Sequence, residues 1–181
     1  MTEPASGPAG RLPGGRPVRG GAPAKEPGTP GRRAVVIGVG NEYRRDDGIG
    51  PEVVAGLRGR VAASVRLVLS DGDPARMIEA WAGASIAVVV DAVRADPLVP
   101  GRLHRIVLGG ADAPQAGRVS SHGLGLGEAI GLARALGRMP DRLVVHAVEA
   151  ADFGYGIGLA PAVAAAAEAL ISAVLRDLAA G

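Results

Sequence analysis

The amino-acid sequence predicts an α/β fold of three layers, in which a mostly parallel, twisted sheet of about five strands, one of them antiparallel, has helices on both faces. Two observations predict it. Short β-branched runs bounded by glycines alternate with segments whose apolar residues recur at helical spacing. The resulting order is β-α-β-α-β-β-α-β-α, which favours a parallel sheet with one odd strand.

Five segments read as strands. Residues 34–40, 65–70 and 85–92 are rich in Val, Ile and Leu, which is typical of central strands buried on both faces. Residues 102–108 alternate polar and apolar side chains after a Pro/Gly turn, as expected of an edge or antiparallel strand. Residues 142–150 form the fifth.

Four further segments have the spacing of amphipathic helices. In the first, Ile49, Val53 and Leu57 lie four apart. In the second, Asp73 is a natural N-cap and Pro74 suits the first helical position. Glycines inside the third lower its helical propensity. The four segments span residues 48–60, 73–83, 120–137 and about 161–178.

The chain divides into an N-terminal extension and one domain. Residues 1–33 contain eight Gly and seven Pro with almost no large apolar side chains, so we expect a disordered Pro/Gly/Arg-rich extension. Residues 34–181 are long enough for a single domain with a real core. The extension carries a net charge of +4 and the remainder −2, so the basic excess does not indicate a nucleic-acid-binding domain.

Composition excludes several kinds of chemistry. The chain has no cysteine, which rules out disulfides, thiolate metal sites and a cysteine nucleophile. Its apolar runs, such as "IAVVV", are too short to cross a bilayer, and no secretory leader pattern is recognisable. We therefore expect a cytoplasmic protein with no membrane partner, whose chemistry depends on oxygen or imidazole groups.

The segment "GVGNEYRRDDGIG", residues 38–50, looks like a nucleotide-binding turn but lacks its features. Position 43 is Tyr where a dinucleotide fingerprint needs its third glycine, and no Gly-Lys-Ser/Thr follows. Asp46 and Asp47 would repel a phosphate at a helix N-terminus. A carboxylate pair in this place suits a cation instead.

Three side chains fall in loops that should meet at the carboxyl edge of the sheet. Asp47 follows the first strand, Asp91 ends the third, and His122 stands at the start of a predicted helix. Two oxygens and one imidazole suit a divalent ion with open coordination positions. The structural alternatives are helix capping for Asp46 and Asp47, a loop-bonding role for Asp91 and a purely structural His122. His104 and His146 lie within predicted strands and read as surface and core residues.

Four segments in this order resemble the hydrogenase maturation endopeptidases: "GVGNEYRRDDGIG", "VVVDAV", "SSHGLGL" and "VEAADFGYGIGLAPAV". The resemblance runs from about Ala34 to Leu178. It implies a peptidase that removes the C-terminal tail of the large-subunit precursor of a nickel–iron hydrogenase. It also implies Asp47, Asp91 and His122 as metal ligands, and a Ni²⁺ ion that the precursor supplies. The sequence alone supports only a divalent metal.

This resemblance suggests a mechanism in which the three ligands complete the coordination of the precursor's nickel, close to the scissile peptide. Asp46 is a candidate for orienting a ligand or the attacking water, Glu149 for a base or peptide contact, and Asn41 for a further accessory residue. Residues 109–119 and 150–158 are candidate docking loops.

Two other functions remain open from the sequence. One is a non-catalytic nickel-checkpoint or chaperone module for hydrogenase assembly, which would bind the loaded subunit without cutting it. The other is a nucleotide- or nucleoside-binding enzyme on a similar α/β fold, although the broken glycine fingerprint and the clustered acids argue against it.

Overall fold

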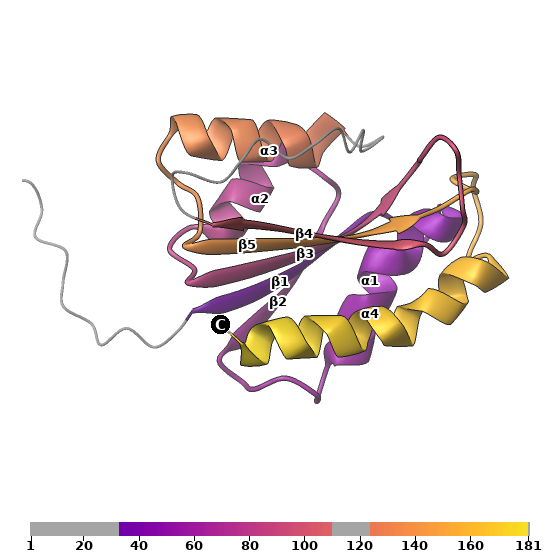
Figure 1. The fold of residues 1–181 in the computed structure, drawn as a ribbon, viewed down its shortest axis with the longest axis horizontal. Coiled ribbons are helices and arrows are strands. Elements are labelled where there is room, and N and C mark those ends of the chain that lie inside the picture. Colours follow the sequence, from indigo (N-terminus) through magenta and orange to yellow (C-terminus); the bar gives the residue numbers. More distant parts are fainter. Residues whose placement is uncertain (1–32, 110–123, 181) are drawn as a thin grey trace, which may run out of the picture.

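The protein has the three layers that the sequence predicts, a sheet between two layers of helices (Figure 1). The strand order in the sheet is β2-β1-β3-β5-β4. The structure, a computed structural model, describes residues 33–109 and 124–180. Strands β1, β2, β3 and β5 are parallel, and β4 runs antiparallel to β5. The strands span Ala34–Val39 (β1), Val65–Ser70 (β2), Ile86–Val93 (β3), Leu103–Gly109 (β4) and Arg142–Glu149 (β5).

Helices cover both faces of this sheet. Helices α1 and α4 lie against one face, and α2 and α3 against the other (Figure 1). A short 3-10 helix, η1, leads directly into α1. The element order is therefore the predicted one, and the glycines of α3 do not prevent its formation. The bounds are Arg45–Gly48 (η1), Ile49–Leu57 (α1), Pro74–Trp81 (α2), Leu124–Ala135 (α3) and Pro161–Ala179 (α4).

Burial of the strands agrees with the sequence at the centre of the sheet and differs at one edge. All eight residues of β3 are buried, as expected of a strand between two helical layers. The expectation that β2 is equally central is wrong, because β2 is an edge strand that pairs with β1 alone. Its Arg66 is exposed, and Leu69 is 56% exposed. The polar residues in "VRLVLS" are the feature that distinguishes it from the two central runs.

Strand β4 is held to its neighbours by a carboxylate on each face. On the face of α2 and α3, Glu149 contacts His104, with 2.7 Å between Oε1 and Nε2. On the face of α4, Asp177 accepts a hydrogen bond from Arg105 Nε at 3.1 Å and contacts His146 Nε2 at 2.8 Å. His104 is partly exposed and His146 is buried, which matches the surface and core interpretations of these residues.

Two glycines explain how α1 approaches β1. A Cβ atom added to Gly38 would lie 2.4 Å from the carbonyl oxygen of Gly50, and one added to Gly50 would lie 2.2 Å from that of Val39. Strand and helix therefore meet backbone to backbone, with no room for a side chain. Two of the glycines in residues 38–50, Gly38 and Gly50, are therefore explained by the packing of α1 on β1 and not by phosphate binding.

Some expectations fall outside the described residues. The predicted disorder of residues 1–33 concerns a segment of which the structure describes only Arg33, whose carbonyl accepts a hydrogen bond from the amide of Ser85. The loop before α3 and the predicted start of that helix lie within residues 110–123, which are not described. In the described ranges, no helix combines the length and apolarity needed to span a membrane.

We predict that Gly38→Ala destabilises the fold by about 3 kcal/mol, because the new methyl group must push α1 away from β1. Gly131→Ala in α3 is the matched control: a Cβ atom there meets nothing within 4 Å. That change should raise stability by about 0.5–1 kcal/mol through helix propensity. Urea denaturation of both variants tests this, and equal stabilities of the two would contradict the packing argument.

A candidate active site at the carboxyl edge of the sheet

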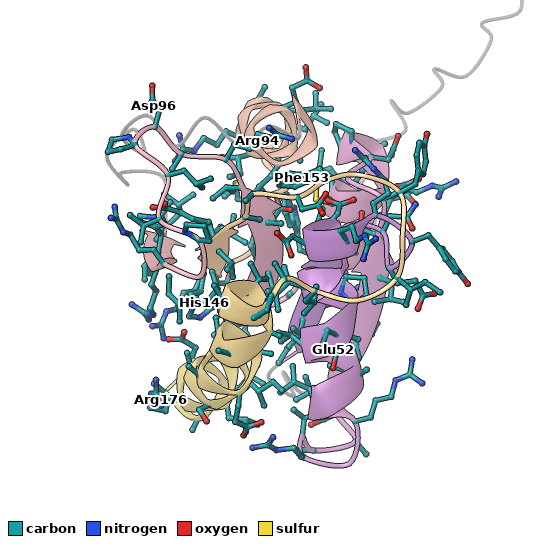
Figure 2. All side chains as sticks on the ribbon, turned by 90° about the vertical axis from the view of Figure 1, so that its right-hand side faces the viewer. Glu52, Arg94, Asp96, His146, Phe153 and Arg176 are labelled. Carbon is teal, nitrogen blue, oxygen red and sulfur yellow. The ribbon has the colours of Figure 1, made fainter. Side chains whose placement is uncertain are left out.

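The loops that follow β1, β3 and β5 meet at the carboxyl edge of the sheet and enclose a cavity of about 410 Å³. Figure 2 looks onto this edge, with Arg94 and Phe153 next to each other beside the start of α3. Two of the three predicted ligands, Asp47 and Asp91, line the cavity. The other lining residues are Val39, Gly40, Arg44, Asp71, Gly72, Ala92, Arg94, Gly125, Leu126 and Phe153.

Asp91 occupies the most apolar position of the site. It lies near the end of the fully buried strand β3 and is 5% exposed. Burial raises the pKa of its carboxyl group to about 7; the backbone of Ala92 lowers this pKa, and the charge of Asp47 raises it. Burial therefore affects the pKa of Asp91 more than its hydrogen bond with the backbone does, which argues against a purely loop-bonding role. Among the residues that the structure describes, no cationic side chain forms an ion pair with Asp91.

Asp47 is better solvated and is held by its own loop. Its Oδ2 accepts a hydrogen bond from the backbone amide of Asn41 at 3.1 Å and lies 3.8 Å from Nη1 of Arg44. Burial still raises its pKa, against the opposing effects of Arg44 and Asn41. Gly40, at φ +125°, lets the chain turn here, because a Cβ atom would lie 1.9 Å from the Asp47 carbonyl oxygen. This glycine therefore shapes a carboxylate site.

Asp46 has a structural role that the sequence did not indicate. It is fully buried, and its carboxylate accepts three backbone hydrogen bonds, from Ala151 at 3.2 Å, Asp152 at 3.0 Å and Ala160 at 2.7 Å. Its own amide donates to the carbonyl of Asp152 at 3.0 Å. The helix-capping alternative is therefore wrong for Asp46. Its side chain caps neither η1 nor α1, and instead fixes the loop that precedes α4.

The other two accessory candidates lie apart from the cavity wall. Glu149 is 1% exposed; its Oε2 accepts a hydrogen bond from the amide of Val99 at 2.5 Å, and its Oε1 faces His104 and Arg102. These contacts, led by the Val99 amide, lower its pKa. Asn41 contributes its amide to Asp47, while its side-chain oxygen accepts a hydrogen bond from the amide of Tyr43. Both residues support the loops around the site.

Three residues of the cavity wall were not singled out from the sequence. The guanidinium of Arg94 lies 4.7 Å from the centre of the Phe153 ring, and Arg44 donates a hydrogen bond to the Phe153 carbonyl at 3.4 Å. No carboxylate in the described part of the chain forms an ion pair with Arg94. Two features of the sequence could have pointed to these residues: Arg94 directly follows "VVVDAV", and Phe153 is the chain's single phenylalanine.

His122 lies outside the described residues, so its place relative to the two aspartates stays a prediction. Among the residues that are described, no group of three or more His, Asp and Glu side chains is arranged to hold a metal ion. The third aspartate that lines the cavity, Asp71, is paired with Arg76 at 3.5 Å. The described site therefore supplies the two predicted carboxylates from separate loops. Such oxygen donors, one of them desolvated, suit a divalent cation that brings further ligands with it.

We predict that Asp46→Asn lowers the free energy of unfolding by about 3 kcal/mol, because an amide can accept fewer hydrogen bonds and brings donors against donors. This loss corresponds to a fall in Tm of about 6–12 °C. Asp141→Asn is the control, since Asp141 is exposed and should change stability by less than about 0.5 kcal/mol. Differential scanning calorimetry tests both, and an unchanged Tm for Asp46→Asn would contradict the structural role.

Comparisons with known proteins agree on one family. The model of the family described as hydrogenase maturation protease matches residues 51–177. The hydrogenase 2 maturation protease of Escherichia coli K12 is 29% identical over 150 residues, covering 81% of this chain and 90% of its own. These matches span most of the folded part of the chain.

Solved structures support the fold. The hydrogenase-maturating endopeptidase HybD of E. coli superposes with a TM-score of 0.68 at 24% identity, covering 81% of this chain and 91% of its own. The [NiFe] hydrogenase maturation protease HybD of Thermococcus kodakarensis gives a TM-score of 0.64 at 20% identity, and the match covers 80% of this chain and 97% of that protein's chain. The family match over most of the domain, together with this fold and a carboxylate-lined cavity at its carboxyl edge, shows that the chain belongs to the hydrogenase maturation protease family.

Proposed function

We propose that this protease removes the C-terminal tail from the large-subunit precursor of a [NiFe] hydrogenase after nickel has been installed. The nickel ion belongs to the substrate and serves as the recognition element. Family membership supports the maturation role, and relatives are described as acting on hydrogenases. We assign the reaction to the cytoplasm, as the sequence predicts.

The observation that carries this proposal is the meeting of two acidic side chains, Asp47 and Asp91, in one cavity. Asp91 is buried, and the charge of the nearby Asp47 raises its pKa further. Arg44 forms an ion pair with Asp47, and no equivalent partner is recorded for Asp91 in the described ranges. A divalent cation entering with the substrate would compensate this charge, whereas a metal-free precursor would not.

The residues fit nickel carried by a partner better than a resident metal. Two carboxylates from the described loops, completed by the predicted imidazole of His122, would leave coordination positions for the precursor's own ligands. Once bound, the ion would supply Lewis-acid chemistry at the scissile carbonyl. An enzyme with only these donors should hold free metal weakly, so that the loaded precursor is selected.

Hydrolysis itself needs a water molecule, a proton acceptor and stabilisation of an oxyanion. Water adds to the carbonyl carbon, the C–N bond breaks, and the water's proton passes to the departing amine. The carboxylates of Asp47 and Asp91, which both line the cavity, are the proposed acceptors of that proton. Arg94 projects from the wall of the same cavity and is the described cation best placed to stabilise negative charge on the carbonyl oxygen.

Replacing Asp47, Asp91 or His122 with Ala should abolish processing, by about a hundredfold or more in kcat/KM, while the fold persists. The assay is incubation with nickel-loaded large-subunit precursor, followed by mass spectrometry of the product. Asp141→Ala, an exposed change far from the cavity lining, should cleave at the wild-type rate. If all three site variants cleave normally, the assigned site is wrong. If wild-type protein binds the precursor but leaves it intact, the proposed reaction is wrong.

The pH dependence of stability gives a second test. Ionised Asp91 destabilises the folded, metal-free protein, so Asp91→Asn should be more stable than wild type at pH 8, by on the order of 2–4 kcal/mol. The folded pKa is about 7 and lies above the unfolded value, so the gain should fade as pH falls from 7 toward 4. Chemical denaturation across this range measures it. A gain that stays constant with pH would show that Asp91 is not an isolated buried acid.

A further inference from the structure

Two arginines line the cavity together with its carboxylates, and their guanidinium groups are engaged differently. That of Arg94 lies over the Phe153 ring, and no carboxylate of the described residues forms an ion pair with it. That of Arg44 faces Asp47, with 3.8 Å between Nη1 and Oδ2. A predicted metal ligand therefore already has a cation beside it. Because like charges repel, Arg44 opposes the binding of a metal ion to Asp47 unless its guanidinium moves away.

The backbone of the turn after β1 places Arg44 in this position. The Arg44 amide donates a hydrogen bond to the carbonyl of Asn41 at 3.0 Å, and the Asp47 amide donates one to the carbonyl of Arg44 at 3.1 Å. The amide of Asn41 in turn donates to Oδ2 of Asp47 at 3.1 Å. These bonds tie the three residues to one another, and a bridge between Arg44 and Gly156 ties them to the loop that follows β5. The main chain at Arg44 is therefore fixed.

The side chain of Arg44, in contrast, is held loosely. Its contact with Asp47 is too long for a hydrogen bond, and the hydrogen bond that it does donate goes to the carbonyl of Phe153, at 3.4 Å. The Arg44 side chain is 47% exposed, whereas that of Asp47 is 17% exposed. An ion pair with such an exposed partner contributes little to stability. The guanidinium can therefore turn toward solvent while the carboxylate stays in the cavity.

Arg44 acts on one of the two predicted carboxylate ligands. Burial raises the pKa of Asp47, and the positive charge of Arg44 is the larger of the two effects that oppose this rise. For Asp91, burial raises the pKa to about 7, the backbone of Ala92 lowers it and the charge of Asp47 raises it, with no comparable effect of Arg44. Among the described residues, the cavity thus holds one carboxylate with a counter-ion and one without.

We propose that Arg44 is a displaceable counter-ion that keeps free metal ions out of the site. In the metal-free protein it neutralises Asp47, and an ion that coordinates Asp47 must push the guanidinium toward solvent. A free ion has only its coordination bonds to offset this repulsion, whereas nickel carried by the precursor is also held by the contacts between the two proteins. Arg44 is thus a specificity-determining residue. The inference rests on the proposed function, in which nickel arrives with the substrate.

Free Ni²⁺ is the probe, because its binding requires no precursor. Arg44→Gln removes the charge and keeps a side chain that can donate a hydrogen bond. It should bind Ni²⁺ about tenfold more tightly than wild type at low salt, since the repulsion between a divalent ion and a nearby guanidinium is lost. The difference should shrink as ionic strength rises. Isothermal titration calorimetry of the full chain with nickel chloride measures both, and equal affinities would overturn the proposal.

Two variants separate the charge from other effects of the substitution. Arg44→Lys keeps the positive charge, so its affinity for Ni²⁺ should stay within about threefold of wild type. Arg138→Gln removes the same charge from an exposed position beyond the C-terminal end of α3, whereas the cavity is lined by the start of that helix, and it should keep the wild-type affinity. Binding by Arg44→Lys as tight as that of Arg44→Gln would overturn a role for the charge.

A double variant locates the bound ion. Asp47→Asn combined with Arg44→Gln removes the carboxylate along with its counter-ion. The affinity for Ni²⁺ should then return to the wild-type level or fall below it, because the ion loses a ligand. Tight binding that persists in the double variant would mean that the ion is held elsewhere, and would overturn the proposal.

Inhibition by free Ni²⁺ connects the role of Arg44 to processing. Cleavage of the nickel-loaded precursor by Arg44→Gln should be inhibited at about a tenfold lower concentration of free Ni²⁺ than cleavage by wild type, because the ion occupies the site first. Equal inhibition of the two proteins would contradict this role.

The same measurements separate this proposal from the proposed function. Tighter Ni²⁺ binding by Arg44→Gln, without cleavage of the loaded precursor by wild type, would support the role of Arg44 and contradict the proposed function. Cleavage by wild type, with equal Ni²⁺ affinities of the two proteins, would support the function and overturn the role of Arg44.

Discussion

The carboxylate of Asp46 is the contact on which the geometry of the site depends. It joins the turn after β1 to the loop between β5 and α4, two segments more than a hundred residues apart in sequence. Because Asp46 and Asp47 are neighbours, fixing the first determines where the second can point. The same bonds hold the loop that carries Phe153, and with it the ring beneath Arg94. One buried acid thus orients both walls of the cavity.

The second acid of the pair and Asp91 illustrate the conflict between stability and function. A protein selected only for stability would neutralise Asp91 or replace it with an apolar residue, since an isolated buried carboxylate is unfavourable. Here two carboxylates face one cavity, and the surrounding apolar strand ends offer little solvation. In the proposed function, a cation that enters with the substrate would offset this cost. Selectivity for the loaded substrate would then follow from electrostatics alone, with no moving part.

Much of the fold was predictable because its signals are local. Apolar runs and helical spacing located every described strand and α-helix, though not the 3-10 helix η1, and the alternating pattern of residues 102–108 identified the antiparallel edge strand β4. The position of β2 was harder to predict, since edge or centre depends on which strands pair, and the sequence marks the edge only by Arg66 and Ser70 in "VRLVLS".

The site was predictable in part for the same reason. Asp47 and Asp91 stood out because carboxylates at strand ends are unusual in apolar surroundings, and both line the cavity. The role of Asp46 was missed because its partners, the amides of residues 151, 152 and 160, come from a distant loop and leave no mark in its own segment. Glu149 likewise looked available at a strand end, although the turn before β4 and His104 engage it.

The two carboxylates that flank β4 make this strand acid-labile. Hydrogen bonds and nearby cations lower the pKa of both Glu149 and Asp177, for Asp177 against the opposing effect of burial. Groups with a depressed folded pKa stabilise the protein above their unfolded values and lose this contribution as pH falls. In acid, β4 would therefore lose the side-chain contacts of His104 and Arg105 and would depend more on its backbone pairing with β5. A β4 held less firmly would leave the edge of β5 more often unpaired, and an unpaired strand edge is the kind of surface from which protein aggregation starts.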